Sequence, residues 1–171
     1  MKISVFGLGY VGSVATACFA RDGHRVIGVD TDPYKADLVN RGVSPIIEKD
    51  LPEMLAEGVN AGAILATTDH REALLQTDLS LICVGTPSQP TGDLDLTSVI
   101  RVCETIGQAL KNKSTRHLVV VRSTMLPGSM EGSVIPTLEC FSGKPAGAGF
   151  GVAINPEFLR ESSAIHDFYY P

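Results

Sequence analysis

The chain alternates between short apolar runs and longer segments that fit helices. The apolar runs, each of strand length, cover residues 2–6, 26–29, about 63–66, 79–84, 117–122 and 151–154. The helical segments lie near residues 10–21, 34–41, 51–58, 70–76, 97–110 and 128–140. Each of them is long enough to carry the chain back across a sheet to a parallel strand. The pattern therefore predicts an α/β fold with a doubly wound parallel sheet of about six strands and helices on both faces.

Two stretches interrupt this alternation and are expected to be connecting loops. One covers residues 42–51 and contains Pro45, and the other is the glycine-rich piece 143–151. With 171 residues, of which 44% are hydrophobic, the chain is long enough for one well-cored domain and too short for two of ordinary size. We expect a single domain over residues 1–171.

The first apolar run leads directly into a glycine motif, Gly7-Leu8-Gly9-Tyr10-Val11-Gly12. A tight turn after a strand needs glycine at Gly7, and a backbone that contacts a pyrophosphate needs glycine at Gly9. Gly12 is expected to let the helix that begins near Tyr10 pack close to the sheet. The N-terminus of that helix then directs free N–H groups and the positive end of its dipole at the phosphates, which predicts an anion site of Rossmann type.

An acidic residue, Asp30, ends the second apolar run. An acid at this place accepts hydrogen bonds from the adenosine ribose hydroxyls and repels a 2′-phosphate, which favours NAD over NADP. Asp30 could instead cap a helix, but Asp32 and Pro33 already supply an N-cap and a first residue for the next helix. We therefore expect Asp30 to remain free for a ligand, and the cofactor to be NAD.

Composition and charge narrow the range of partners. The formal net charge is −5, and the 14 Lys and Arg residues are scattered rather than gathered in a basic stripe, which disfavours nucleic acid. No apolar run approaches the ~20 residues needed to cross a bilayer, and the first residues lack the pattern of a signal peptide. We expect a cytoplasmic protein with neither a membrane nor a nucleic-acid partner.

The cysteines and histidines show no metal-binding spacing. They are Cys18, Cys83, Cys103 and Cys140, and His24, His70, His117 and His166. The cysteines indicate neither zinc nor a disulfide framework, and we expect reduced, mostly buried thiols. Each histidine is expected to be a surface or loop residue, and no metal site is predicted.

Ligands of a doubly wound sheet lie outside the carboxyl ends of its strands, so residues that follow a strand are candidates for the site. Thr86 either contacts the cofactor or is an ordinary turn residue. Thr124 either caps a helix or binds a ligand, and Pro127 favours the ligand because it indicates that the helix starts later. Lys35 lies in the first turn of its helix, where a cation opposes the dipole, so a nearby anion such as a cofactor phosphate would explain it.

The last strand is followed by Asn155-Pro156-Glu157-Phe158-Leu159-Arg160-Glu161. Asn155 and Pro156 look like the N-cap and first residue of a helix, which would make Glu157 a routine first-turn acid. On a helix, Glu157 and Glu161 would share a face, where two carboxylates could position a water, accept protons or orient sugar hydroxyls. The alternative is that both are solvated surface carboxylates.

Together these motifs resemble those of the nucleotide-sugar 6-dehydrogenase family, and the resemblance spans the whole chain. It rests on the glycine motif, on Val84-Gly85-Thr86-Pro87, on Arg122-Ser123-Thr124 with Pro127-Gly128, and on Asn155 to Glu161. Three stretches, Ser44 to Ile46, Gly92 to Leu96 and Arg160 to Ile165, look more like the branch of the family that oxidises GDP-mannose than the UDP-glucose branch.

The resemblance implies that the full-length enzyme, a homo-oligomer, oxidises the C6 alcohol of a nucleotide sugar to a carboxylate in two hydride transfers to NAD. The expected substrate is GDP-mannose, with UDP-glucose as the alternative, and the product is a uronic acid precursor of alginate type. The resemblance assigns Gly7, Gly9, Tyr10, Val11, Gly12, Asp30, Lys35, Thr86 and Thr124 to the NAD site. It assigns Glu157, Leu159 and Glu161 to the substrate sugar, and Thr124, Glu157 and Glu161 to catalysis.

One part of the family pattern is missing from this chain. The family uses a cysteine, in a glycine-rich motif well beyond the cofactor domain, which holds the intermediate as a thiohemiacetal and a thioester. Cys83 and Cys103 instead fall within an expected strand and an expected helix, where a buried thiol is inert. We therefore interpret the chain as the N-terminal, NAD-binding half of a longer enzyme and expect it to be inactive alone. A non-catalytic NAD-sensing module is the alternative from another functional class.

Overall fold

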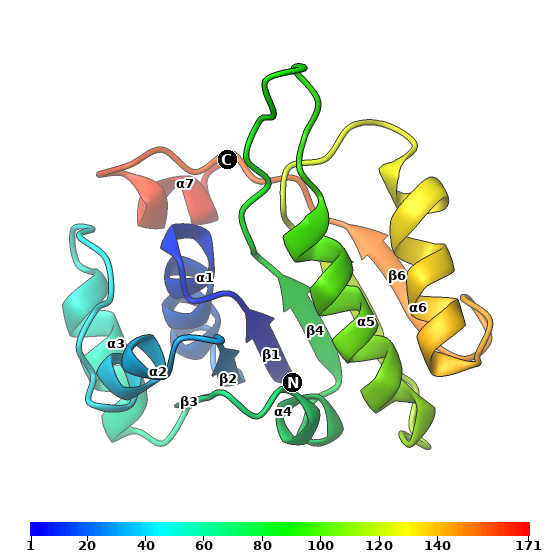
Figure 1. The fold of residues 1–171 in the computed structure, drawn as a ribbon. Coiled ribbons are helices and arrows are strands. Elements are labelled where there is room, and N and C mark those ends of the chain that lie inside the picture. Colours follow the sequence, from blue (N-terminus) through cyan, green and yellow to red (C-terminus); the bar gives the residue numbers. More distant parts are fainter.

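All 171 residues are described by a computed structural model, in which six parallel strands form one sheet (Figure 1). The strands are β1 (Lys2–Phe6), β2 (Arg25–Val29), β3 (Ile64–Thr67), β4 (Leu79–Ile82), β5 (Leu118–Val121) and β6 (Gly151–Ile154). Their order across the sheet is β3-β2-β1-β4-β5-β6. The chain thus winds outward from β1 in both directions and changes direction between β1 and β4. The doubly wound sheet predicted from the sequence is confirmed, with the strand order of a Rossmann fold.

Helices cover both faces of this sheet. They are α1 (Tyr10–Arg21), α2 (Pro33–Asn40), α3 (Leu51–Asn60), α4 (His70–Gln76), α5 (Thr97–Lys111), the π-helical turn η1 (Met130–Val134), α6 (Ile135–Ser142) and α7 (Ala164–Tyr169). The first three helices and α7 pack on one face, and α4, α5, η1 and α6 pack on the other (Figure 1). No helix is long and apolar enough to span a membrane.

Alternation along the strands divides the apolar core between the two faces. In β1, Ile3 and Val5 are buried on the face that α1 covers, together with Leu81 of β4. Phe6 of the same strand is buried on the opposite face with Ile82, against α4 and α5. Parallel strands that are covered on both sides need apolar residues at successive positions, which explains the unbroken apolar runs in the sequence.

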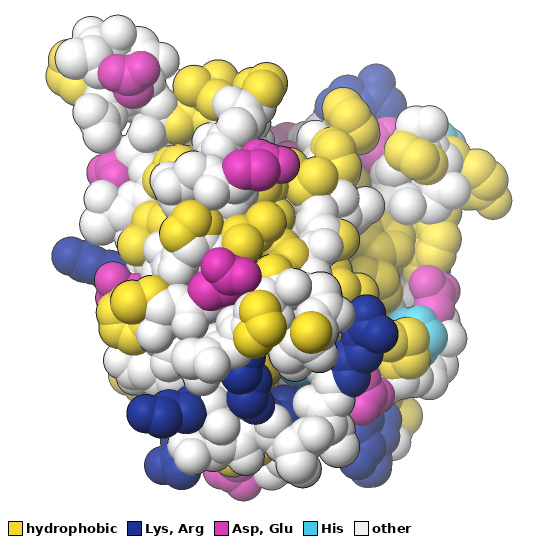
Figure 2. All heavy atoms as spheres, turned by 90° about the vertical axis from the view of Figure 1, so that its right-hand side faces the viewer, with side chains coloured by type: hydrophobic (Ala, Val, Ile, Leu, Met, Phe, Trp, Pro, Cys, Tyr) yellow, Lys and Arg dark blue, Asp and Glu magenta, His cyan; other side chains and the backbone are white.

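The outer face beside α6 and β6 carries a mixed surface. In Figure 2 hydrophobic side chains gather in its upper half, and most of the Lys and Arg side chains lie in its lower half, next to acidic ones. The cations on this face therefore form no continuous stripe.

Most expected elements are confirmed at nearby boundaries, and the differences have local causes. The helix expected near residues 128–140 is divided into η1 and α6. The division lies at Pro136, which has no N–H to donate to the preceding turn. The strand expected over 79–84 already ends at Ile82, and the sequence pattern does not predict the short helix α7.

A buried network of hydrogen bonds links β1, β4 and the loops that precede β4 and β5. The hydroxyl groups of Ser4 and Ser80 are 2.8 Å apart, and the Thr77 hydroxyl lies 3.1 Å from that of Ser4. His117 Nε2 is 2.8 Å from the Ser80 hydroxyl, and His117 Nδ1 is 3.1 Å from the Thr77 carbonyl oxygen. His117 lies in the loop just before β5, as expected, but it is not a surface residue, since only 1% of it is exposed.

The partners of His117 determine its protonation. A carbonyl oxygen only accepts, so Nδ1 must carry the proton, and Nε2 accepts from the Ser80 hydroxyl. Burial, with the nearby Lys113 ammonium as the second cause, lowers the pKa of His117 from 6.5 to about 4. Neutral His117 satisfies every hydrogen bond of the network, and a charged ring would place a donor against Ser80 without solvent to stabilise it.

The first prediction concerns the pH dependence of stability. Because the folded-state pKa of His117 lies below its unfolded value, the unfolded chain binds an extra proton between about pH 6.5 and pH 4. This group should therefore lower the free energy of unfolding by about 2 kcal/mol between pH 7 and pH 5, and have little further effect below pH 4. Urea unfolding at the two pH values measures the loss, and H117Q should lack this component. An equal pH-dependent loss in both proteins would contradict the assignment.

Candidate functional site

The turn between β1 and α1 lies at the point where the sheet changes its winding direction. Gly7 has φ +97°, in the left-handed region that favours glycine, and its N–H donates to the Val29 carbonyl oxygen at 2.7 Å. A Cβ at Gly12 would lie 1.8 Å from the Gly7 carbonyl oxygen, so only glycine lets α1 start this close to the turn. A Cβ at Gly9 would meet nothing within 4 Å. The space beside Gly9 is therefore open to a ligand.

The N-terminus of α1 faces this space. The Ser13 N–H donates to the Gly9 carbonyl oxygen at 3.0 Å, which leaves the amides of Tyr10, Val11 and Gly12 without a helical partner. The first turn contains no acidic residue. These amides and the helix dipole favour an anion next to Gly9, so the turn fits the pyrophosphate for which the sequence predicts a site.

Asp30 lies directly after β2 and is tied to the glycine turn. One carboxylate oxygen accepts from the Leu8 N–H at 2.7 Å, and the other accepts from the Asp32 N–H at 3.0 Å. The Lys35 ammonium is 3.8 Å from the first of these oxygens. The protein thus holds Asp30 by two hydrogen bonds, and each oxygen retains a lone pair for the ribose hydroxyl that the sequence predicts as its partner. The same ion pair supplies an anion beside Lys35 within the protein itself.

Two pockets flank the glycine turn, and Val84 lines both. The Asp30 pocket is lined by Phe6, Gly7, Val29, Asp30, Thr31, Thr68, His70, Val84, Arg101, Val102 and Thr105. The Glu157 pocket is lined by Gly9, Tyr10, Val11, Cys83, Val84, Gly85, Thr86, Arg122, Ser123, Thr124 and Glu157. An extended ligand whose centre lies against the glycine turn can therefore place one end in each pocket.

Hydroxyl groups connect the loops that follow β4 and β5. The Thr86 hydroxyl donates to the Thr124 carbonyl oxygen at 2.8 Å. The Ser123 hydroxyl donates to the Val84 carbonyl oxygen at 2.6 Å and is buried, although the sequence assigns it no role. Thr124 is exposed and does not cap a helix, because the next helical turn begins only at Met130. Thr86 and Thr124 therefore lie together in the wall of the Glu157 pocket.

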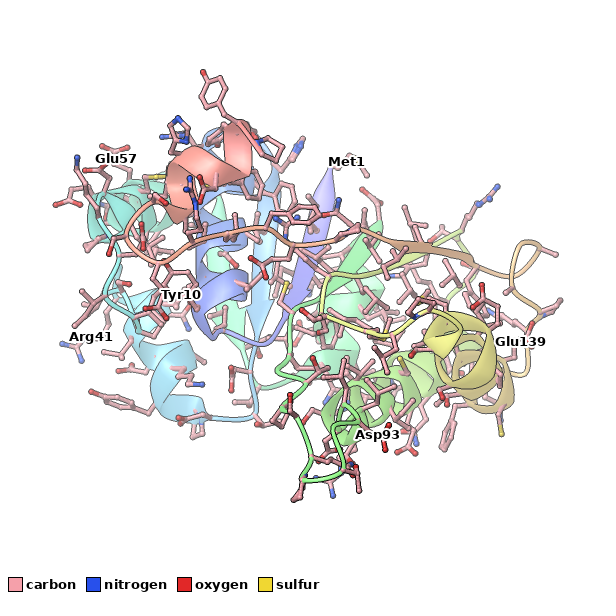
Figure 3. All side chains as sticks on the ribbon, turned by 90° about the horizontal axis from the view of Figure 1, so that it is seen from above. Met1, Tyr10, Arg41, Glu57, Asp93 and Glu139 are labelled. Atoms are coloured by element: carbon pink, nitrogen blue, oxygen red, sulfur yellow. The ribbon has the colours of Figure 1, made fainter.

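The chain after β6 is not the helix that the sequence suggests. Residues 155–160 have no regular secondary structure, and the Glu157 carboxylate accepts a hydrogen bond from the Leu159 N–H. Figures 1 and 3 show this segment running across the carboxyl ends of the strands from β6 to α7. Glu157 lines its pocket, Glu161 is exposed outside it, and half-buried Leu159 packs against the core beneath α1 and α3. The two glutamates therefore share no helical face.

Arg122, a residue without an assigned role in the sequence analysis, lines the pocket opposite the glycine turn. Its Nη1 donates to the Asn155 side-chain oxygen, whereas its buried Nε has no partner in the protein. Its guanidinium carbon lies 5.4 Å from the centre of the Phe168 ring. The cation thus joins the end of β5 to the segment after β6.

Tyr10 connects the glycine turn to Glu48, a buried acid in the loop between α2 and α3. The Tyr10 hydroxyl donates to the Glu48 carboxylate. Burial, followed by this hydrogen bond to an anion, raises the pKa of Tyr10 well above its usual range. No local sequence signal identifies Glu48, because its partners are distant along the chain.

The thiols of three cysteines are buried and protonated. Burial raises the pKa to about 11 for Cys18 and to about 12 for Cys83 and Cys103. Cys83 lines the Glu157 pocket, but a thiol with this pKa supplies no thiolate near neutral pH. Cys140 is exposed on α6, so the expectation of mostly buried thiols is confirmed for the other three.

Comparisons with known proteins agree with this geometry. Residues 1–171 match the NAD binding domain of the UDP-glucose/GDP-mannose dehydrogenase family. The chain is 56% identical, over its whole length, to GDP-mannose 6-dehydrogenase of Azotobacter vinelandii, of which it covers 39%. It is 40% identical to a UDP-glucose 6-dehydrogenase of Haloferax volcanii, again covering 39% of that protein.

A solved structure gives the same result for the fold. The crystal structure of a ternary complex of GDP-mannose dehydrogenase from Pseudomonas aeruginosa superposes with a TM-score of 0.97 at 55% identity, over 98% of this chain and 38% of that one. This chain spans about two fifths of the length of the relatives it matches. It belongs to the UDP-glucose/GDP-mannose dehydrogenase family and corresponds to the NAD-binding domain of that family.

Proposed function

We propose that this chain is the cofactor-binding part of a GDP-mannose 6-dehydrogenase, an enzyme that oxidises the C6 alcohol of GDP-mannose to the carboxylate of GDP-mannuronate. The observation that carries the proposal is the Glu157 pocket, where the glycine turn and Glu157 line one space. The identity of 56% to a GDP-mannose enzyme, against 40% to a UDP-glucose enzyme, supports this choice of substrate.

The two pockets provide a place for NAD along the edge of the sheet, with its adenosine end on the side of Asp30. The amides at the start of α1 would hold the pyrophosphate, and Asp30 would accept hydrogen bonds from the adenosine ribose. Lys35 adds a cation on the same side. Thr86 and Thr124 then line the other pocket, where the nicotinamide end lies. When bound there, NAD supplies the two-electron oxidant for each of the two oxidation steps.

Glu157 is the acid–base group that this chain brings to the reaction. Its carboxylate is half-buried beside the nicotinamide end of the site, where it can hold a water molecule and accept a proton from it. That water cleaves the thioester in the second half of the reaction. The cysteine that forms the thioester belongs to a part of the enzyme outside these residues, since the three buried thiols are protonated and Cys140, exposed on α6, does not line the Glu157 pocket.

Glu161, Leu159 and Thr124 complete the proposed site. Glu161 orients the sugar from the exposed end of the segment after β6, and Leu159 holds that segment against the core. Thr124 contacts the reacting groups from the loop after β5. In the full-length enzyme, which we propose to be a cytoplasmic homo-oligomer, the product serves as a precursor of alginate-type polysaccharide.

Substrate choice tests the proposal directly. The intact enzyme that contains this domain should form two NADH for each GDP-mannose oxidised, and UDP-glucose should give little turnover at equal concentration. Stopped-time assays that measure NADH and sugar acid check both expectations. Oxidation of UDP-glucose without turnover of GDP-mannose would contradict the proposed substrate and assign the chain to the UDP-glucose branch. A native chain that binds NAD but responds to neither sugar would instead favour an NAD-sensing module.

The glycine turn yields a paired prediction. G9A should change the free energy of unfolding by no more than about 1 kcal/mol, because its Cβ meets no protein atom. It should nevertheless weaken NAD binding about tenfold or more, because the methyl group occupies the place of the pyrophosphate. G12A should cost about 3 kcal/mol of stability, because its Cβ would lie 1.8 Å from the Gly7 carbonyl oxygen. Urea unfolding and titration calorimetry distinguish the two effects, and equal behaviour of the variants would contradict them.

Asp30 should determine the choice between NAD and NADP. D30A removes a charged acceptor of the ribose hydroxyls and should weaken NAD binding by about 1.5–3 kcal/mol. Binding of NADP should weaken much less, because the same change removes a repulsion from the 2′-phosphate. Calorimetry with both dinucleotides provides its own control, since damage to the Leu8 turn would weaken both equally. An unchanged NAD affinity would remove Asp30 from the cofactor site.

A further inference from the structure

Glu48 is a buried carboxylate without a cation. It lies in the loop between α2 and α3, is only 6% exposed, and forms no ion pair with Lys, Arg or His. Three donors replace the water that it has lost: the Tyr10 hydroxyl, the Ser162 N–H at 2.8 Å and the Ala164 N–H at 3.2 Å. A buried charge is retained at such a cost only where its hydrogen bonds are satisfied.

The three donors belong to two separate parts of the site. Tyr10 is the first residue of α1 and lines the Glu157 pocket. Ser162 lies within residues 155–163, the segment that carries Glu157 and Glu161, and Ala164 directly follows it. In Figure 3, Tyr10 lies at α1 beside the loop that leads into α7. Glu48 thus accepts one hydrogen bond from the cofactor turn, through Tyr10, and two from the end of the sugar-facing segment, through Ser162 and Ala164.

Backbone strain is concentrated at the same contact. Asp50 and Ser162, at φ +63° and +69°, are the two residues other than glycine with positive φ. One lies in the loop of Glu48, and the other donates its N–H to Glu48. Such conformations persist only where the surroundings compensate for their cost, and they are common where two parts of a site must be held in register.

A second carboxylate holds the other side of the segment. Asp167, on α7, accepts two hydrogen bonds from the Arg160 guanidinium, at 2.8 and 3.0 Å, and one from the Arg160 N–H at 3.0 Å. These contacts stay within residues 160–167. The Tyr10 hydroxyl also lies 3.4 Å from the Arg160 carbonyl oxygen, but Glu48 is the carboxylate that joins amides of the segment to the glycine turn.

We propose that Glu48 is a positioning residue that couples NAD binding at the start of α1 to the ordering of residues 155–163. A ligand that restrains the first turn of α1 also restrains the Tyr10 hydroxyl, and Glu48 transmits this restraint to the Ser162 and Ala164 amides. The coupling is reciprocal, so an ordered segment favours NAD. The inference rests on the proposed function, because it takes the glycine turn as the NAD site and residues 155–163 as the carrier of the sugar-facing glutamates.

Amide hydrogen exchange, measured by NMR on the 171-residue chain, tests the coupling. In the wild-type chain, saturating NAD should slow exchange of the Ser162 and Ala164 amides about tenfold. Y10F removes the hydrogen bond from Tyr10 to Glu48, together with the 3.4 Å contact to the Arg160 carbonyl oxygen, and leaves the Glu48 carboxylate with both amides. With NAD again at saturation, exchange of the Ser162 and Ala164 amides in Y10F should slow little. E48Q should speed exchange of both amides without NAD and abolish the response, and E57Q, the same change at an exposed site on α3, should behave as wild type.

The outcomes separate this inference from the proposed function. NAD binding that depends on Asp30, without any change in exchange at Ser162 and Ala164, would overturn the coupling and leave the cofactor site intact. A wild-type response in Y10F would overturn it equally, even if E48Q fails to fold. If the wild-type chain fails to bind NAD, the proposed function is refuted, and the coupling is refuted with it because NAD is its ligand. A response lost in both Y10F and E48Q, but kept in E57Q, would establish Glu48 as the connection.

Discussion

The arrangement of the whole site depends on one close contact, between Gly12 in the first turn of α1 and the carbonyl oxygen of Gly7. No side chain fits there, since even a Cβ would come within 1.8 Å of that oxygen. The contact determines where α1 begins and in which direction it leaves the sheet. The unpaired amides of α1 therefore face the open space beside Gly9, and Tyr10, the first residue of α1, reaches Glu48. Displacement of α1 would move the anion site and the support of the sugar-facing segment together.

The two ends of the sheet differ in whether their polar groups are already hydrogen-bonded within the protein. At the amino-terminal half, Ser4, Ser80 and His117 bond to one another and leave no group for a ligand. At the carboxyl ends, the helix amides, the Asp30 carboxylate and the buried Nε of Arg122 keep bonding capacity that the protein does not use. The satisfied network of Ser4, Ser80 and His117 thus lies at one end, and the unused bonding groups around the glycine turn lie at the other, where a parallel sheet with a topological switch point binds its ligands.

The segment after β6 shows how a site can be built from chain without regular structure. It has no ladder or helix to satisfy its amides, so two carboxylates do so, Glu48 from one side and Asp167 from the other. Hydrogen bonds from the Arg160 guanidinium, the Arg160 N–H and the Ser163 hydroxyl hold the pKa of Asp167 well below its usual range. Both acids accept hydrogen bonds from a backbone that would otherwise have to be solvated. Loops held in this way position a side chain such as Glu157 while leaving its carboxylate accessible.

The sequence by itself determined the features that depend on residues close together along the chain. The apolar runs predicted the strands, the three glycines predicted the turn and anion site, and Asp32 with Pro33 predicted the start of α2, where Asp32 accepts from the Tyr34 N–H. Tertiary structure alone decided which acids are bonded, that His117 is buried, and that residues 155–160 are not helical. Glu48 illustrates the reason: its partners lie 38, 114 and 116 residues away. A local pattern records backbone preference and burial, whereas the conformation of such a segment is selected by hydrogen bonds that exist only after the sheet has brought distant residues together.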